Sequence, residues 1–263
     1  MASPGGSMPL MSRCRPRRMA LLAATVLAGL VLASAPAAAV DIAVVNNNDA
    51  GAGSLRQAML TAGPGDRIVL ADNLGTILLG SPLPMITSNL TIEGGVGNTI
   101  DGQSQHRIFF ADSGTVVIND LTLANGLATG GNGGGVQSEG GGGGGGLGAG
   151  GAVFVNETAN VTLRNVSLQN NSANGGNGGD SVGGGGLFDS GGGGGGFGGT
   201  GGQGGYEGGG GGGGFAGNGG SAPNATNNFA GAEGGGLSAN GNDAIASTPG
   251  AGGNIEGGDG GIP

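Results

Sequence analysis

The sequence predicts an all-β fold in which the chain coils and stacks short parallel strands as a β-solenoid. Two sixteen-residue stretches, Val116–Gly131 and Val161–Gly176, lie 45 residues apart and share apolar residues at their first, third, sixth and eighth positions. Other short segments are rich in β-branched residues and bounded by Gly, Asn or Asp, as strands between tight corners are. The chain also holds 72 Gly among 263 residues, whereas about 7% is usual, so we expect long glycine-rich loops.

Residues 1–39 have the three parts of an export signal. A basic start with Arg13 and Arg18 precedes the uncharged run Met19–Leu32, and Ala33–Ala39 supplies small residues for cleavage after Ala39. We therefore expect an exported mature chain, extracellular or at the cell surface. The uncharged run is shorter than the roughly 20 residues of a membrane-spanning helix, so the mature chain is expected to have no such span.

The mature chain is acidic. It keeps all 17 acidic residues and only four arginines, a net charge of about −13. Phosphate binding needs clustered Lys or Arg, which excludes nucleic acid as a partner. The single cysteine, Cys14, is lost with the signal, so no disulfide supports the mature fold.

Residues 40–82 are predicted to form strand, short helix and strand. The strands are Asp41–Asn46 and Asp66–Asp72. Between them, Ser54 is a suitable N-cap, and Gln57 three residues later completes a capping box. The apolar positions of the helix follow one helical face: Leu55, Ala58, Met59 and Ala62.

Residues 83–174 are predicted to hold the stacked strands. Asp120 and Asn165 are expected at the bend between two strands, and Asn125 and Asn170 at the next corner, since Asn and Asp tolerate left-handed geometry. Equivalent apolar positions of the two sixteen-residue stretches, up to Leu123 and Leu168, should stack in the same interior columns, two rungs of about 22 residues apart. The expected strands are Leu83–Ile86, Asn89–Gly94, Thr99–Gly102, Arg107–Asp112, Val116–Gly126, Ala152–Val155 and Val161–Asn171.

The stretch VNNNDAGAGSLRQAMLTAGPGDRIVL resembles the N-terminal motif of secreted bacterial parallel β-helix proteins, which include autotransporter passengers and polymorphic outer-membrane proteins. TIDG, LTLANG and GGAVFV resemble the repeats that follow it. The resemblance implies a right-handed parallel β-helix of the pectin-lyase-like type, with Leu55–Ala62 capping its first rung. It also implies an adhesin or structural role, with an extracellular glycan or a host or neighbouring cell surface as partner. The outer-membrane barrel of such proteins is absent, so we expect a truncated member.

Two glycine-rich inserts, 130–151 and 175–222, leave the predicted coil at equivalent places, and 223–263 is expected to form degenerate or incomplete rungs. The favoured interpretation of the inserts is a mobile linker. The alternative is an extended helix with three residues per turn. In such a helix, aromatic residues spaced nine apart would share one face: Phe188, Phe197, Tyr206 and Phe215.

Three functions remain open from the sequence. The leading one is a non-enzymatic surface protein, and the others are a polysaccharide lyase or glycoside hydrolase and a glycine-rich surface repeat protein. An enzyme would rely on Asp101, Asp112, Asp120 and Arg107, with His106 nearby. By their spacing these residues fall on different corners of the coil, so we expect them to cap backbone groups.

One stretch, GGNGGDSVG, fits a calcium-binding nonapeptide, with Asp180 as the ligand and Asp189 nine residues further on. Calcium rolls need tandem copies because the ligands come from neighbouring turns, and the sequence holds no second full copy. No cofactor is therefore expected.

Overall fold

The computed structural model describes residues 39–136, 140–182, 190–205, 208–222, 232–236 and 239–244. Contacts divide the chain into Met1–Ala37 and Ala38–Pro263, and the described residues all belong to the second unit. The predicted export signal, apart from Ala39, lies outside the described residues. Among those described, no helix is long and apolar enough to cross a membrane.

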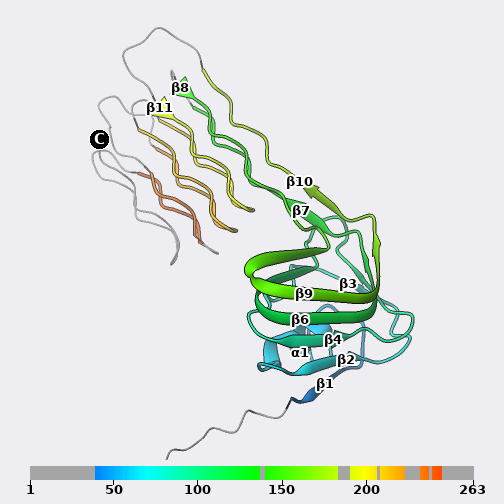
Figure 1. The fold of residues 1–263 in the computed structure, drawn as a ribbon. Helices are drawn as coiled ribbons and strands as arrows, with labels where there is room; N and C mark the ends of the chain where they lie inside the picture. Colours follow the sequence, from blue (N-terminus) through cyan, green and yellow to red (C-terminus); the bar gives the residue numbers. More distant parts are fainter. Residues whose placement is uncertain are drawn as a thin grey trace, which may run out of the picture. The chain divides into compact units, whose positions relative to one another are not determined.

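The first region is a curled sheet in which every pairing between strands is parallel (Figure 1). The 16-residue β6 and 17-residue β9 follow the curl continuously, and in the described part the one α-helix is α1 (Leu55–Thr61). The all-β parallel class is thus confirmed. The strands are β1 (Asp41–Val44), β2 (Arg67–Leu70), β3 (Thr76–Leu78), β4 (Leu90–Glu93), β5 (Thr99–Asp101), β6 (Phe109–Ala124) and β9 (Val153–Gln169).

The two similar stretches stack as predicted but lie closer than predicted. The register pairs Val116 with Val161, Ile118 with Leu163, Leu121 with Val166 and Leu123 with Leu168. These residues belong to β6 and β9, which are direct neighbours and not two rungs apart. The spacing of 45 residues is long because the glycine-rich segment around 130–151 leaves the sheet between them.

Apolar side chains of successive strands form buried columns inside the curl. Ile68, Ile92 and Ile118 are paired through β2, β4 and β6, and each is 0% exposed. The columns become exposed at β9, where Leu163 is 38% and Leu168 is 55% exposed. The expectation that Leu168 is as buried as its counterparts is therefore wrong, because no further strand among the described residues covers β9.

Left-handed residues make the corners of β6 and β9, as predicted. Asp120 and Asn165 have φ of 52° and 51°, and Asn125 and Asn170 have φ of 51° and 52°. Asn and Asp pay a smaller penalty there than other non-Gly residues, because their short polar side chains can bond locally. The equivalent residues therefore turn both strands in the same way.

The helix predicted near the N-terminus is confirmed. The Oγ of Ser54 accepts a hydrogen bond of 3.2 Å from the N–H of Gln57, and Leu55 and Ala58 are buried against the sheet. Two strand predictions need correction: Leu83–Ile86 makes only an isolated bridge between Ile86 and Ala111, and β3 was not predicted.

The second region consists of extended glycine-rich segments, which we call legs, that lie beside one another (Figure 1). Their backbone hydrogen bonds recur at every third residue: Gly193 and Gly196 donate to Gly202 and Gly199, and Gly192 and Gly195 donate to Gly141 and Gly144. An extended helix with three residues per turn makes no internal hydrogen bonds, so its N–H and C=O groups are available to neighbouring legs. The spacing therefore identifies the legs as helices of this kind. Four short strands mark ladders between legs: β7 (Leu127–Thr129) with β10 (Ser172–Asn174), and β8 (Gly140–Gly141) with β11 (Ser190–Gly191).

The legs form two rows. Within each row, hydrogen bonds join parallel neighbours, and between the rows they join antiparallel neighbours. The expectation of mobile loops is wrong for these residues, and the described parts of 223–263 are further legs, not incomplete rungs. The first row contains 172–182, 127–136, 199–205, 217–222 and 239–244, and the second contains 140–151, 190–198, 208–215 and 232–236.

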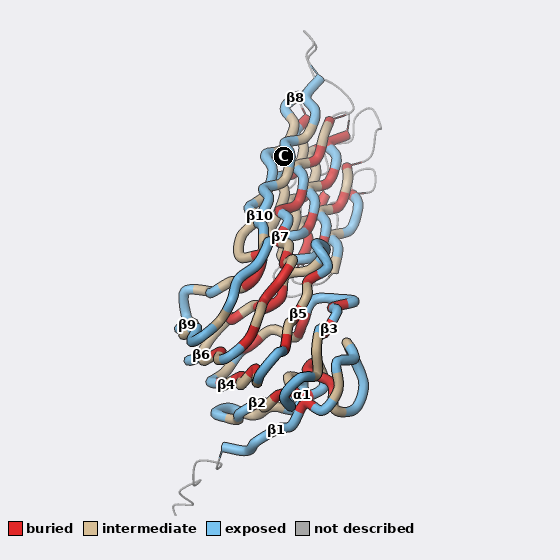
Figure 2. The backbone as a smooth tube through the Cα atoms, turned by 90° about the vertical axis from the view of Figure 1, so that its right-hand side faces the viewer, coloured by how far each residue is buried: buried red, intermediate tan, exposed pale blue. Residues whose placement is uncertain are grey.

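Glycine is required at most positions where a leg faces the opposite row. A Cβ on Gly131 would overlap the carbonyl oxygen of Gly199, and one on Gly134 would overlap that of Gly202. Both glycines are buried, and Figure 2 shows buried positions recurring along the legs 127–136, 199–205 and 217–222 between less buried ones. Legs can thus pack closely only because the facing positions lack side chains.

The nine-residue aromatic period has a different origin from the one predicted. The legs 190–198, 199–205 and 208–215 begin nine residues apart and alternate in direction, so Phe197 and Phe215 lie on neighbouring parallel legs. Their rings stack with centroids 5.3 Å apart. The rings therefore do not line one face of a single helix; Phe188 and Tyr206 lie outside the described residues.

Candidate functional site

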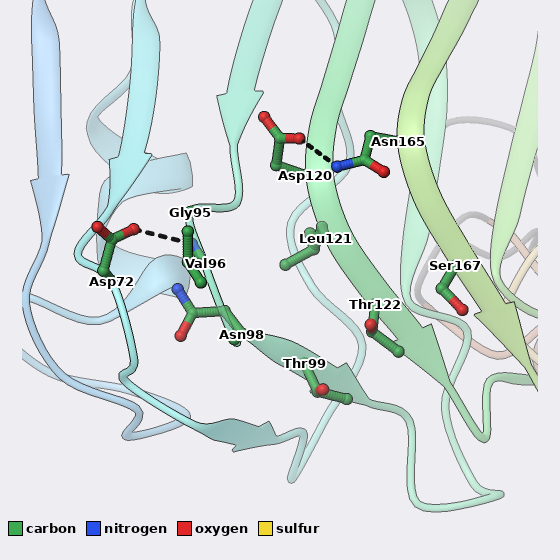
Figure 3. A pocket seen from close by; sticks show the side chains of 11 residues that line it. Asp72, Gly95, Val96, Asn98, Thr99, Asp120, Leu121, Thr122, Asn165 and Ser167 are labelled. Carbon is green, nitrogen blue, oxygen red and sulfur yellow. Dashed lines mark hydrogen bonds between the residues drawn. The ribbon is translucent and has the colours of Figure 1, made fainter.

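A polar cleft of about 660 Å³ lies beside the corner where β6 and β9 bend (Figure 3). Its side chains include Asp72, Asn98 and Asp120. The two carboxylates lie apart and each already accepts a hydrogen bond, Asp72 from the N–H of Val96 at 2.8 Å and Asp120 from the Nδ2 of Asn165 at 2.6 Å. The cleft thus holds two separate, engaged carboxylates and not a facing pair.

The three aspartates considered for catalysis share one structural role. Each carboxylate accepts a hydrogen bond from the side-chain amide of an Asn on a neighbouring strand or corner. The structure does not bring them together: Asp120 lines the polar cleft, Asp112 lines another, and Asp101 lines neither. The pairs are Asp101 with Asn125, Asp112 with Asn156, and Asp120 with Asn165, at 2.9, 2.8 and 2.6 Å.

Arg107 lies inside an aromatic cluster that joins the sheet to the legs. Its guanidinium carbon is 4.4 Å from the ring centroid of Phe197 and 5.6 Å from those of Phe110 and Phe154. Its Nη2 also donates to the carbonyl oxygen of Ala149 at 3.0 Å. Burial lowers the pKa of Arg107 to about 10, so it stays charged at neutral pH. Its contacts are those of a cation held between rings.

Two mostly apolar clefts border this cluster. One of about 370 Å³ is lined by His106, Arg107, Leu127 and Phe215 among others, and the other, of about 550 Å³, includes Asp112. The 370 Å³ cleft has no carboxylate in its lining. His106 therefore lacks an acidic partner among the residues lining its own cleft.

The outward side of the first row of legs carries an ordered array of short polar side chains, which we call the polar face. Side chains on it repeat every third residue, about 9 Å along each leg. Neighbouring legs place equivalent residues side by side. The polar face consists of Asn177, Asn132, Thr200, Asn218 and Asn240 and, three residues further on, Asp180, Gln203, Ser221 and Asp243.

Hydrogen bonds fix the orientation of amides on the polar face. The Oδ1 atoms of Asn132, Asn218 and Asn240 accept from the backbone N–H groups of Asn177, Thr200 and Asn218, each at 2.8 Å. The Nδ2 groups of these three Asn donate no hydrogen bond within the described part of the chain. The polar face therefore presents a row of preoriented donors.

Of the two candidate calcium ligands, the structure describes only Asp180. Asp180 is exposed on the polar face, and Asp189 lies outside the described residues. Within the described ranges, no group of three or more His, Cys, Asp or Glu side chains is placed to hold a metal ion.

The polar face was not predicted from the sequence, although a signal for it exists. Polar residues recur at every third place among glycines, which is the period of the legs. The signal lies in Asn174, Asn177 and Asp180, then Thr200 and Gln203, then Asn218 and Ser221, then Asn240 and Asp243.

No family model matches the chain, and no curated protein or solved structure matches it either.

Proposed function

We propose that the chain is an exported, non-enzymatic, right-handed parallel β-helix that acts as an adhesin or scaffold at the cell surface or outside the cell. The curled sheet, its parallel pairings and its repeated left-handed corners support the β-helix. In this proposal the β-helix carries the glycine legs, and the polar face is the adhesive surface.

The preoriented amide row of the polar face is the observation that carries the proposal. Because each Oδ1 is already engaged, Asn132, Asn218 and Asn240 present donors whose side-chain entropy is already lost, which favours binding. Hydroxyl and ring oxygens of an extended polysaccharide are matching acceptors. The described charges of this face are the carboxylates Asp180 and Asp243, which disfavour an acidic polymer and favour a neutral one.

A binding assay tests this assignment. The double variant Asn132→Asp/Asn218→Asp keeps an acceptor for the neighbouring N–H groups and removes the outward donors. Asn48→Asp/Asn160→Asp adds the same charge at exposed positions elsewhere and is the matched control. We expect wild type and control to be retained on cellulose or chitin particles and the polar-face variant to be lost. Equal retention of both variants, or no retention of wild type on any neutral polysaccharide, would contradict the assignment.

A polysaccharide lyase or hydrolase is the second candidate, and the 660 Å³ cleft with Asp72 and Asp120 is the observation that favours it. The hydrogen bonds from Asn side chains favour a structural role for the candidate aspartates instead. We expect no turnover of neutral or acidic polysaccharides, with or without calcium. Turnover that disappears on changing Asp101, Asp112 or Asp120 to Asn would establish the enzyme.

A further inference from the structure

The outward side of the second row of legs carries no side chains at the corresponding positions, and we call it the bare face. Unlike the facing glycines, these do not need to be glycine for internal packing. A Cβ on Gly144 would meet nothing within 4 Å, and one on Gly194 or Gly212 would meet its nearest atom at 3.8 Å. The bare face consists of Gly141, Gly144, Gly191, Gly194, Gly209 and Gly212.

The two outer faces also differ in whether the backbone N–H groups of their outward residues are hydrogen-bonded. On the polar face, the N–H groups of outward residues such as Thr200 and Asn218 are accepted by side chains of the next leg. On the bare face, the N–H groups of Gly144, Gly194 and Gly212 donate no hydrogen bond within the described residues. Unpaired backbone groups in a regular row are a template for another chain, as at the edge of a sheet.

The chemistry of the bare face matches a copy of itself. On the legs 190–198 and 208–215, each turn leaves one donor and one acceptor unpaired among the described residues, for example the N–H of Gly194 and the C=O of Gly195. A glycine that packing within the chain does not require is typical of a position that another backbone approaches closely. The bare face carries no charge that would repel a second copy of this acidic chain. At its border, Leu147 is 65% exposed and adds apolar area.

We propose that the bare face binds the bare face of a second copy, so that the chain forms a two-fold dimer through glycine legs. The contact repeats between two chains the close glycine-to-glycine packing that joins the two rows within one chain. A two-fold dimer uses the same patch on both partners, which a face with equal numbers of donors and acceptors satisfies. This inference is independent of what the polar face binds.

The oligomeric state of the purified full chain tests the proposal. Light scattering after size-exclusion chromatography over a range of concentrations should give the mass of two chains for wild type. Gly194→Asn/Gly212→Asn places on the bare face the side chains that the polar face carries, and should give the mass of one chain with an unchanged circular dichroism spectrum. Thr200→Asn, a change on the polar face, is the matched control and should remain a dimer.

Three results would overturn the proposal. The first is a wild type that has the mass of one chain at all concentrations, including one that binds a polysaccharide through the bare face. The second is a Gly194→Asn/Gly212→Asn variant that stays dimeric. The third is a Thr200→Asn variant that dissociates, because the contact would then lie on the polar face.

Discussion

The curled sheet and the glycine legs both pack neighbouring segments of the chain closely, the sheet through side chains and the legs through backbone. In the sheet, side chains such as Ile92 and Ile118 are fully buried in columns, and burial of apolar surface provides the stability. In the legs, facing positions such as Gly131 and Gly193 must lack side chains, and backbone hydrogen bonds hold the rows together. The comparison shows that a glycine-rich segment can be a packed structure whose core consists of backbone.

The difference makes the legs dependent on the sheet. Each hydrogen bond contributes only about 0.5–1.5 kcal/mol net, and glycine loses more backbone entropy on folding than any other residue. The aromatic cluster, in which Phe197 and Phe215 lie against Phe110, provides apolar contacts where legs and sheet meet. We therefore expect the legs to unfold more easily than the sheet.

The largest expected effect distinguishes the covered columns of the sheet from its exposed last strand. Leu123 and Leu168 are partners in register, but Leu123 is 0% and Leu168 is 55% exposed. Leu123→Ala should lower the free energy of unfolding by about 2–5 kcal/mol, because it leaves a cavity. Leu168→Ala should change it by less than about 1 kcal/mol. Urea denaturation followed by circular dichroism measures both, and equal effects would show that β9 is covered.

The next effect distinguishes facing from outward glycines. A Cβ on Gly193 would overlap the carbonyl oxygen of Gly211, whereas one on Gly194 has room. Gly193→Ala should destabilise the legs by about 1–3 kcal/mol, the usual cost of overpacking, and Gly194→Ala should leave the packing within one chain nearly unchanged. Limited proteolysis of the legs provides the measurement. Equal cleavage of the two variants would mean that the legs are not packed.

A smaller effect concerns the contact between the two regions. Arg107→Lys keeps the charge but loses the planar stacking on Phe197, a loss of about 0.5–2 kcal/mol. Arg164→Lys, at an exposed position of β9, is the matched control. The first variant should make the legs unfold at lower urea concentration than the sheet does, and the control should not. A variant that shifts both regions equally would argue against a local role.

The smallest effect is a pH dependence confined to the start of the sheet. The pKa of Asp66 is lowered because it accepts hydrogen bonds from the backbone N–H groups of Val40 and Gly63, at 2.9 and 2.7 Å. A carboxyl whose pKa is lower in the folded state stabilises the fold above its unfolded pKa, and this contribution is lost as the pH falls through the folded value. Stability should thus fall below about pH 4, and Asp66→Asn should reduce that slope. An unchanged slope would show that Asp66 does not contribute to the pH dependence of stability.

The sheet was predictable from the sequence because its signals are local. Alternating apolar residues, Asn or Asp at corners and the helix cap at Ser54 each specify geometry within a few residues. The pairing of β6 with β9 was placed one rung too far apart, since the sequence does not show which residues leave the coil. The exposure of Leu168 depends on whether another strand covers β9, and no local signal reports that.

The legs were harder to predict because glycine carries little information about its surroundings. The nine-residue spacing of the aromatic residues is evident in the sequence, but one leg of three turns and one reversal of the chain per leg give the same period. The polar face was missed because its residues come from legs far apart in sequence. The candidate aspartates lie apart, Asp101 at the end of β5, Asp112 within β6 and Asp120 at a left-handed corner.

Amide hydrogen exchange of the glycine legs, followed residue by residue by NMR, tests the central claim most directly. The N–H groups of Gly193, Gly196, Gly202 and Gly211 each donate to another leg. If the legs are packed as described, these amides should exchange at least about tenfold more slowly than in an unfolded chain, which corresponds to about 1.4 kcal/mol of protection. Exchange of all four at the rate of an unfolded chain, while Ile92 and Ile118 in the sheet remain protected, would contradict the account and return the legs to mobile linkers.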